Sequence, residues 1–327
     1  MTTFALTFAT RPSALARWQT HWVMQALQAA WPDLECAEKA ITTQGDRILD
    51  RPLPEIGGKG LFTQELESEL QRGAVHAAVH SLKDLPVEDP PDLTIGAIPA
   101  RGEARDALVS REGYTLESLP EEARVGTSSL RRSAQLLALR PDLRVEPLRG
   151  NVDTRLRKAE EGLYDAIILA GAGLERLGFA ERISQWLPLD AMLPAPGQGA
   201  LAVQCRAQDS QTRELLSAIE DPAARAATIA ERAFLEGMGG GCSLPVAAYA
   251  EHRQGQLHLY GRVISLDGCR AIDCQVAGED PQVIGLECAR QALEQGAAEL
   301  LAESSVYLPA VDRSSTQTQS ERHGSES

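Results

Sequence analysis

The 327-residue sequence lacks the features of several broad protein classes. It has no run of about 18 apolar residues, which argues against a membrane-spanning helix and a membrane partner. The opening segment, MTTFALTFATRPS, has no basic stretch followed by an apolar core, so it does not resemble a secretory signal and we expect a cytoplasmic protein. A net charge of −14 argues against nucleic acid as a partner, because Lys and Arg dominate phosphate binding.

The sequence also lacks the spacings of common metal sites. Its six cysteines form no CxxC pair, and we expect a cytoplasmic chain to keep them reduced. His76 and His80 lie in a stretch that resembles a strand, where four residues span about 13 Å, too far for one shared ion. We therefore expect neither a metal site nor a disulfide.

What the chain does contain is a twice-repeated alternation of strand-like and helix-like segments. Residues 3–9, 34–42, 74–80 and 93–100 have strand patterns, with helical spacing at 13–31 and 61–73. A second alternation begins at residue 106 and ends near residue 170. This pattern predicts two α/β units with substantially parallel sheets. Residues 197–205 resemble one more buried strand, which we expect to return to the first unit.

The pattern changes from about residue 220. A helix over 223–237 precedes strand-like runs at 246–252, 256–264 and 269–277, and one long helix is predicted over 281–304. Grouped strands followed by a helix indicate a small α+β domain. Three glycines at 239–241 lead into Cys242. That thiol has five candidate roles, of which the lack of paired cysteines weakens two: disulfide half, metal ligand, nucleophile, attachment point or small buried residue.

The strongest indication of an anion site is VGTSSLRRSAQL. A strand ends at Gly126, and three hydroxyl residues, Thr127, Ser128 and Ser129, follow where a helix begins. Helix N-terminal N–H groups favour anions, whereas the adjacent Arg131 and Arg132 oppose the helix dipole unless an anion is present. The alternative is that Ser128 or Ser129 merely caps the helix and both arginines are surface residues.

Further cations occupy similar strand-to-helix corners. In open α/β sheets, ligands bind outside the carboxyl ends of strands, so these side chains are expected to converge on one cleft. In a chain of net charge −14, such a cluster indicates a polyanionic ligand. The residues are Arg11 with Ser13, Arg149, Arg155 and Arg176.

A carboxylate lies among these cations, in the segment SLKDLP. Asp84 follows Ser81 and Lys83 at the end of a predicted strand. It either caps a turn before Pro86 or accepts hydrogen bonds from ligand N–H groups and stabilises a cation. The nearby GGKG lacks P-loop spacing and better fits the hinge of a mobile lid that carries Lys59.

Taken together, these segments resemble the porphobilinogen deaminase family, also called hydroxymethylbilane synthases. The resemblance extends from about residue 4 to residue 305, and HSLKDLP and GTSSLRR are its most specific motifs. Gln204 stands where the family usually has Glu, a difference that bears on a structural ion pair. The other matching motifs, in chain order, are TRPSALARWQ, IGGKGLFTQELE, LRGNVDTRL, AGLERLG, LPAPGQGALA and GGGCSLPVAAYA.

The resemblance implies a fold of three domains. Two doubly wound α/β domains similar to the halves of periplasmic binding proteins are expected at 1–98 with 199–219 and at 99–198. A small α+β domain at 220–311 would carry the cofactor cysteine, followed by a disordered tail at 312–327. The resemblance also implies a monomeric, cytoplasmic transferase that joins four porphobilinogen molecules head to tail, releases ammonia and yields hydroxymethylbilane.

The family's site residues carry over one by one. The resemblance implies that Cys242 holds a dipyrromethane cofactor through a thioether and that Asp84 is catalytic. Residues matching the cofactor site are Ser81, Lys83, Thr127, Ser128, Ser129, Arg131 and Arg132. Residues matching the site for porphobilinogen and the growing oligopyrrole are Arg11, Ser13, Gln19, Lys59, Arg149, Arg155, Arg176, Gln198 and Gly199.

Two other functions remain possible from the residues alone. A non-catalytic, two-lobed protein that binds an oxoanion or small acid would use the same cationic cleft, but it would need neither Asp84 nor a third domain. A cysteine acyltransferase would need a His base, and nothing in the sequence ties His252 or His258 to Cys242.

Overall fold

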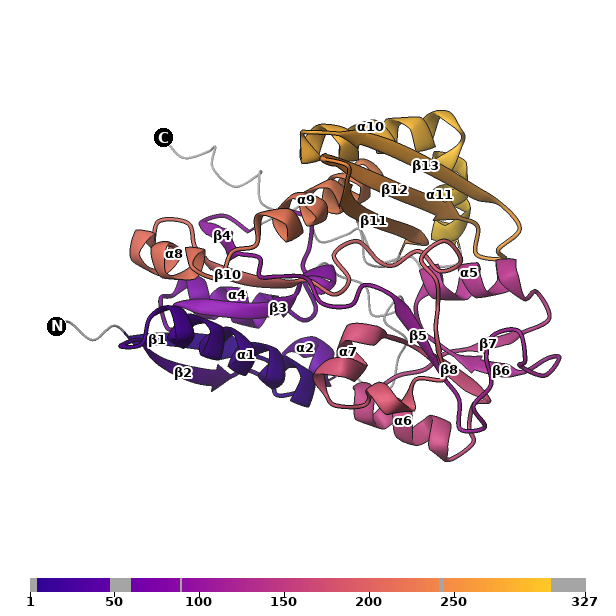
Figure 1. The fold of residues 1–327 in the computed structure, drawn as a ribbon, viewed down its shortest axis with the longest axis horizontal. Coiled ribbons are helices and arrows are strands. Elements are labelled where there is room, and N and C mark those ends of the chain that lie inside the picture. Colours follow the sequence, from indigo (N-terminus) through magenta and orange to yellow (C-terminus); the bar gives the residue numbers. More distant parts are fainter. Residues whose placement is uncertain (1–4, 48–59, 89, 241–243, 307–327) are drawn as a thin grey trace, which may run out of the picture.

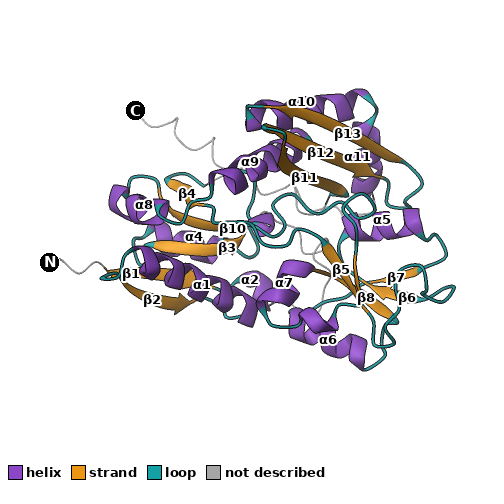
Figure 2. Ribbon diagram, viewed as in Figure 1, coloured by secondary structure: helices purple, strands orange, loops and turns teal. Residues whose placement is uncertain are grey.

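The structure, a computed structural model, describes residues 5–47, 60–88, 90–240 and 244–306, whose strands form three sheets (Figure 1). Two sheets have five strands with helices on both faces, and the third has three strands packed against helices (Figure 2). This confirms the predicted fold class of two doubly wound α/β units and a small α+β unit. Within the described ranges, every helix is too short or too polar to cross a membrane.

The first sheet is built mainly from the N-terminal residues. Its strands are β1 (Ala5–Thr10), β2 (Glu35–Ala40), β3 (Ala77–Ser81), β4 (Leu93–Ala97) and β10 (Leu201–Arg206), and its helices are α1 (Ala14–Ala30), α2 (Gln44–Arg47), α4 (Gln64–Gln71) and α8 (Ser210–Ser217). The strand order is β2-β1-β3-β10-β4. Leu27 of α1 and Leu216 of α8 pack on one face, and Leu66 of α4 packs on the other.

The second sheet repeats this plan. Its strands are β5 (Asp106–Val109), β6 (Arg124–Gly126), β7 (Arg144–Glu146), β8 (Ala166–Ala170) and β9 (Gln185–Trp186), and its helices are α5 (Leu130–Leu139), α6 (Val152–Glu160) and α7 (Gly171–Arg176), followed by a 3₁₀ turn, η2 (Ala180–Arg182). The strand order is β7-β6-β8-β5-β9. Leu136 of α5 lies on one face, and Leu156 of α6 and Leu174 of α7 lie on the other.

In each sheet the antiparallel strand is the one that has just crossed from the other unit. Strand β5 follows the crossing at 98–105 and runs antiparallel to β8. Strand β10 follows the return crossing at 187–200 and runs antiparallel to β3 and β4, which confirms that 197–205 returns to the first unit. The crossings touch where Gly102 N donates to Gly199 O at 3.1 Å. Gly199 has φ +88°, and a Cβ there would lie 2.6 Å from Gly102 O, so only glycine fits.

The third unit packs against both crossings. It contains α9 (Pro222–Gly237), β11 (Val246–Arg253), β12 (Gln256–Ile264), β13 (Ala271–Gly278), α10 (Pro281–Glu294) and α11 (Ala297–Val306). Glu231 of α9 is fully buried and forms a two-point ion pair with Arg101, with Nη1–Oε1 and Nη2–Oε2 distances of 2.5 and 3.1 Å. Its carboxylate also accepts from Gly197 N and Ala250 N. One buried carboxylate therefore joins α9, β11 and both crossings.

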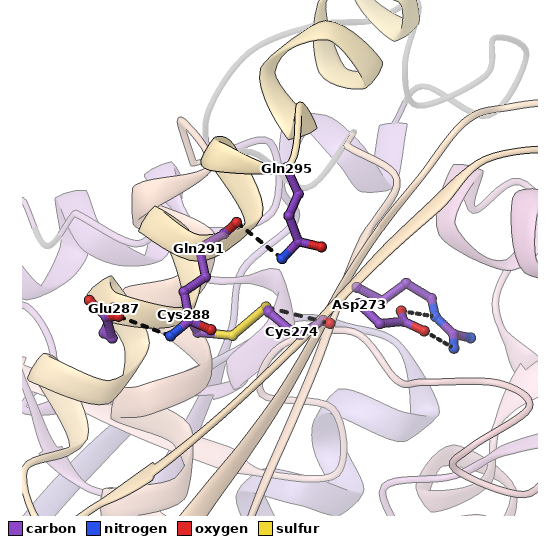
Figure 3. The surroundings of a disulfide bond; sticks show 8 residues. Asp273, Cys274, Glu287, Cys288, Gln291 and Gln295 are labelled. Atoms are coloured by element: carbon purple, nitrogen blue, oxygen red, sulfur yellow. Dashed lines mark hydrogen bonds and ion pairs between the residues drawn. A yellow bond between two sulfur atoms is a disulfide. The ribbon is translucent and has the colours of Figure 1, made fainter.

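Two expectations for the third unit are wrong. The single helix predicted over 281–304 is two helices, because Gly296 adopts φ +97° between α10 and α11. The cysteines are not all reduced, since Cys274 of β13 and Cys288 of α10 form a disulfide (Figure 3). Packing of α10 on β13 brings their Cα atoms to 5.9 Å, a contact for which a spacing of 14 residues gives no local indication.

We predict that this disulfide stabilises the oxidised protein. Reducing it should lower the free energy of unfolding by about 3 kcal/mol, because a cross-link 14 residues apart restricts the unfolded chain. Denaturant unfolding with and without dithiothreitol measures the difference. The exposed free cysteine provides a control, since Cys269→Ser should leave the difference unchanged. Equal stability of the wild type in both conditions would contradict the prediction.

Candidate active site

Asp84 projects from a turn whose flanks are buried. The 3₁₀ turn η1 (Leu82–Asp84) follows β3, and Leu82 N donates to Ala200 O of the return crossing at 3.0 Å. Leu82 and Leu85 are almost fully buried in one apolar cluster, whereas Asp84 between them is exposed. The local sequence therefore anchors the turn on both sides and leaves the carboxylate accessible to a ligand.

The hydroxyl residues of GTSSLRR contact the protein itself. Ser129 is the N-cap of α5, accepting from Arg132 N, which is the capping role left open by the sequence. The Ser128 hydroxyl both donates to Leu148 O and accepts from Leu148 N. Thr127 is buried, and its hydroxyl accepts from Ser129 N. These contacts fix the strand-to-helix corner from which Arg131 and Arg132 extend.

Arg131 and Arg132 share one buried carboxylate that the sequence reasoning missed. Asp106, the first residue of β5, is fully buried and lies 2.8 Å from Arg131 Nη1 and 2.7 Å from Arg132 Nη2. The arginines are only 3% and 6% exposed, so they are not surface residues. Burial would raise the pKa of Asp106, but the two guanidiniums outweigh burial and hold it well below its usual range. The anion that balances the two arginines is therefore the protein's own Asp106 carboxylate.

Gln198 connects this charge cluster to the Asp84 turn. Its Nε2 donates to Asp106 Oδ1 at 2.8 Å and to Ala104 O at 2.7 Å. Its Oε1 accepts from Lys83 Nζ at 3.3 Å and from Arg132 Nη2 at 3.4 Å. Because an amide both donates and accepts, Gln198 can join the Asp106 carboxylate to Lys83 of the first unit and Arg132 of the second. The structure thus brings Gln198, Lys83, Arg132 and the Asp84 turn together, as the sequence predicted.

Like charges act on Lys83 and Arg155 in this corner. Burial lowers the pKa of Lys83 to about 8, with Arg132 as the next cause and with Asp84 opposing both. Burial also lowers the pKa of Arg155 to about 10, aided by Arg132 and Arg149 and opposed by Asp84. The charges that act on Lys83 and Arg155 are those of Arg131, Arg132, Arg149, Asp84 and Asp106, so these residues form one cluster of five cations and two carboxylates.

Other predicted site residues lie beside this corner and have defined partners. Gln19 of α1 is buried and donates to the Ser81 hydroxyl at 2.9 Å. Ser13 is the N-cap of α1, accepting from Ala16 N. Arg11 pairs with Asp46 and lies 4.1 Å over the Phe62 ring.

Arg176 lies at the contact between the two crossings. It donates to Gly199 O at 2.6 Å and faces the Trp18 ring, at 5.9 Å from its centroid. Burial lowers its pKa to about 10, and Glu175 opposes the shift. Arg176 is therefore placed by its hydrogen bond to the return crossing at Gly199.

Cys242, Lys59 and Gln204 were also singled out by the sequence. Cys242 and Lys59 lie outside the described residues. Gln204 is buried on β10, next to β3, where His80 is also buried and has its pKa lowered to about 4, first by burial. A neutral imidazole beside a neutral amide provides no ion pair at this position.

Comparison with known proteins identifies the family. A sequence profile described as "Porphobilinogen deaminase, dipyromethane cofactor binding domain" matches residues 6–214, and the profile of the C-terminal domain matches residues 226–294. A porphobilinogen deaminase from Roseiflexus castenholzii is 54% identical over 300 residues, covering 91% of this chain and 99% of the relative. One from Moorella thermoacetica is 51% identical over 295 residues, covering 90% and 94%.

The chain belongs to the porphobilinogen deaminase family. As a family member it is a transferase of tetrapyrrole synthesis that polymerises porphobilinogen and uses a dipyrromethane cofactor. This assignment favours the polymerising enzyme over the non-catalytic binding protein. Among solved structures, a TRAP periplasmic solute binding protein from Desulfovibrio salexigens is 12% identical with a TM-score of 0.41, covering 67% of this chain and 73% of that protein. A structural similarity with this TM-score is too low to support a conclusion about function.

The residues of the corner fit the dipyrromethane of porphobilinogen deaminases. Burial lowers the pKa values of Lys83 and Arg155 and neighbouring arginines add to both shifts, so ligand carboxylates would stabilise these cations. Asp84 offers an exposed acceptor to pyrrole N–H groups in the same corner. The donor set therefore suits a group that carries both carboxylates and ring N–H groups.

The lowered pKa of Lys83 predicts a pH dependence for porphobilinogen binding. Lys83 loses its charge as pH rises through about 8, so kcat/KM should fall above that pH because the cation that attracts substrate carboxylates is lost. Arginine stays charged throughout this range, so Lys83→Arg should remove the break. Steady-state kinetics from neutral to alkaline pH measures both. An unchanged break in Lys83→Arg would assign the titration to another group.

Proposed function

We propose that the chain joins four porphobilinogen molecules head to tail, releases one ammonia at each addition and frees hydroxymethylbilane by reaction with one water molecule. The observation that carries this proposal is Asp84, an exposed carboxylate in a corner where burial, aided by neighbouring arginines, lowers the pKa values of Lys83 and Arg155. Porphobilinogen is a single pyrrole ring with two carboxylates, which suit the cations, and a ring N–H, which suits Asp84. Each addition brings two more carboxylates, so the growing chain is the polyanion that this corner requires.

Asp84 is proposed to act on the charge that develops when the aminomethyl group leaves. Loss of ammonia makes the pyrrole ring electron-deficient, and its N–H becomes a stronger donor. A carboxylate that is already in place accepts this hydrogen bond and stabilises the cation without reorganisation. Because the turn is anchored through Leu82 and Leu85, the side chain keeps its position during the reaction.

The cofactor is proposed to be held by a thioether to Cys242, a role that rests on the GGGC motif because this residue is outside the described chain. When bound, the cofactor supplies the ring to which the first substrate is joined. Lys83, with Arg131 and Arg132 held in place by Asp106, would bind its carboxylates. The remaining proposed cofactor residues are Ser81, Thr127, Ser128 and Ser129, which shape the two adjoining strand ends.

Substrate and growing chain are proposed to contact the residues around the same corner. Arg149 and Arg155 belong to the five cations and are the most direct candidates for substrate carboxylates. Arg176 and Gly199, which contact each other at the crossings, are also proposed to bind the substrate and the growing chain. The other members of this set are Arg11, Ser13, Gln19, Gln198 and Lys59, the last on its motif alone.

The unit boundaries and setting are also proposals. We infer domains at 1–98 with 199–219, at 99–198 and at 220–311, with a tail at 312–327. The pairing of β10 with β3 and of β5 with β8 supports the first two, because each unit is completed by a strand that arrives from the other. We further propose that the protein works as a monomer in the cytoplasm.

We predict that Asp84→Asn lowers kcat by a factor of about 10² to 10³ while the protein stays folded. The amide keeps the shape of an exposed side chain but loses the charge that stabilises the cation. The control is Asp92→Asn, which changes an exposed carboxylate at a positive-φ position that Asn tolerates. Turnover of porphobilinogen gives kcat, and Ehrlich's reagent reports bound cofactor. Near wild-type kcat for Asp84→Asn would remove Asp84 from the mechanism.

A further inference from the structure

Arg232 of α9 reaches the chain segment that directly follows Asp84. Its Nη2 donates to Pro86 O at 2.7 Å and to Val87 O at 3.1 Å, and its Nη1 lies 3.3 Å from Leu85 O. One guanidinium therefore binds three successive carbonyls of the segment. The planar fork of arginine suits this arrangement, because several N–H groups point in fixed directions from one rigid group.

A second contact joins the same two parts of the molecule. Gly240 follows α9 and lies two positions before Cys242 in the sequence. An ideal Cβ at Gly240 would lie 2.9 Å from Val87 Cγ2, so the chain after α9 is in close contact with the residue that Arg232 binds. Gly240 also has φ +55°, which a larger residue adopts only with strain. The segment after Asp84 is thus pressed against the approach to the GGGC motif.

The placement of α9 explains why these contacts matter. In Figure 1, α9 lies between the first sheet and the third. Near its start, Ala224 packs in the apolar cluster that contains Leu82 and Leu85, and near its end Arg232 binds the carbonyls of residues 85–87. The turn that carries Asp84 is therefore held along one helix of the unit that contains Cys242.

We propose that Arg232 is a positioning residue for the polymerisation: it fixes the Asp84 turn relative to the unit that carries the cofactor cysteine. This proposal rests on the proposed roles of Asp84 and Cys242. Arg232 does not touch the reacting atoms in this scheme. It acts because displacement of a reacting group by about 1 Å can slow an enzyme by about 100-fold.

The alternative is that Arg232 contributes only to stability, as buried arginines on a helix commonly do. Arg225 is a control for that alternative, and it contributes to stability through an ion pair with Glu220 as well. It lies seven residues earlier on the same helix and is also half-buried. Like Arg232, it binds a backbone carbonyl of the first unit, Ile95 O at 3.3 Å, but that carbonyl belongs to β4 and not to the Asp84 segment.

The experiment compares Arg232→Met with Arg225→Met, since methionine keeps an apolar stem and removes the guanidinium. We expect Arg232→Met to lower kcat by about 10- to 100-fold with little change in KM, because the Asp84 turn is displaced while the cations that bind substrate remain. Arg225→Met should have a kcat close to wild type. Arg232→Lys, which still donates to carbonyl oxygens, should have a kcat between those of Arg232→Met and wild type.

Thermal unfolding and Ehrlich colour complete the test. The proposal requires that Arg232→Met and Arg225→Met have similar melting temperatures and full cofactor content while their kcat values differ. Equal kcat values for the two variants would overturn it, and so would a loss of activity that follows loss of stability or cofactor. Asp84→Asn, assayed in parallel, separates the proposed mechanism from the proposed role of Arg232. An active Asp84→Asn variant would overturn the mechanism itself. If Asp84→Asn is inactive, a negative result for Arg232→Met overturns only the role of Arg232.

Discussion

The ion cluster at Asp106 is the constraint on which the rest of the site depends. Two nearly buried arginines cannot keep their charges in the protein interior without an anion, and Asp106 supplies it at 2.8 and 2.7 Å. The same carboxylate accepts from Gln198, which in turn accepts from Lys83 beside Asp84. A single buried acid therefore fixes the start of α5, the return crossing and the end of β3. It leaves to a ligand the charge of Arg155, whose pKa is lowered first by burial and then by Arg132 and Arg149.

The double crossing of the chain explains why the cluster lies where it does. Asp106 starts the strand that has just entered the second unit, and Gln198 precedes the strand that returns to the first. Each unit thus contributes residues at the point where the other is completed. The third unit binds both crossings through Glu231 and the Asp84 segment through Arg232. A movement of the third unit would accordingly be transmitted to the crossings and to the Asp84 turn by two defined sets of contacts.

Sequence reasoning located the corner but not its internal partners. Strand and helix periodicity predicted the α/β units, and the rule that ligands bind at the carboxyl ends of strands brought Lys83, Arg131, Arg132 and Arg155 together. The role of Asp106 was not predicted, because a single acid at the start of an apolar strand forms no local sequence pattern. Its role depends on side chains that are distant in sequence. The same holds for the Cys274–Cys288 disulfide and for the hydrogen bond of Arg176 at Gly199, which depend on packing between elements. The internal hydrogen bonds of Thr127, Ser128 and Ser129 could not be told from a ligand role by sequence, because a cap and an anion site share the same residues.

The central claim is that this cationic corner serves an oligopyrrole fixed to the chain at one cysteine. Intact-mass spectrometry of the active protein as purified, followed by peptide mapping, tests it most directly. The account predicts a single two-ring pyrrole adduct on every molecule, located on the peptide that contains GGGCSLP, and no adduct on peptides that contain the other five cysteines. A fully active preparation in which Cys242 carries no modification would contradict the account.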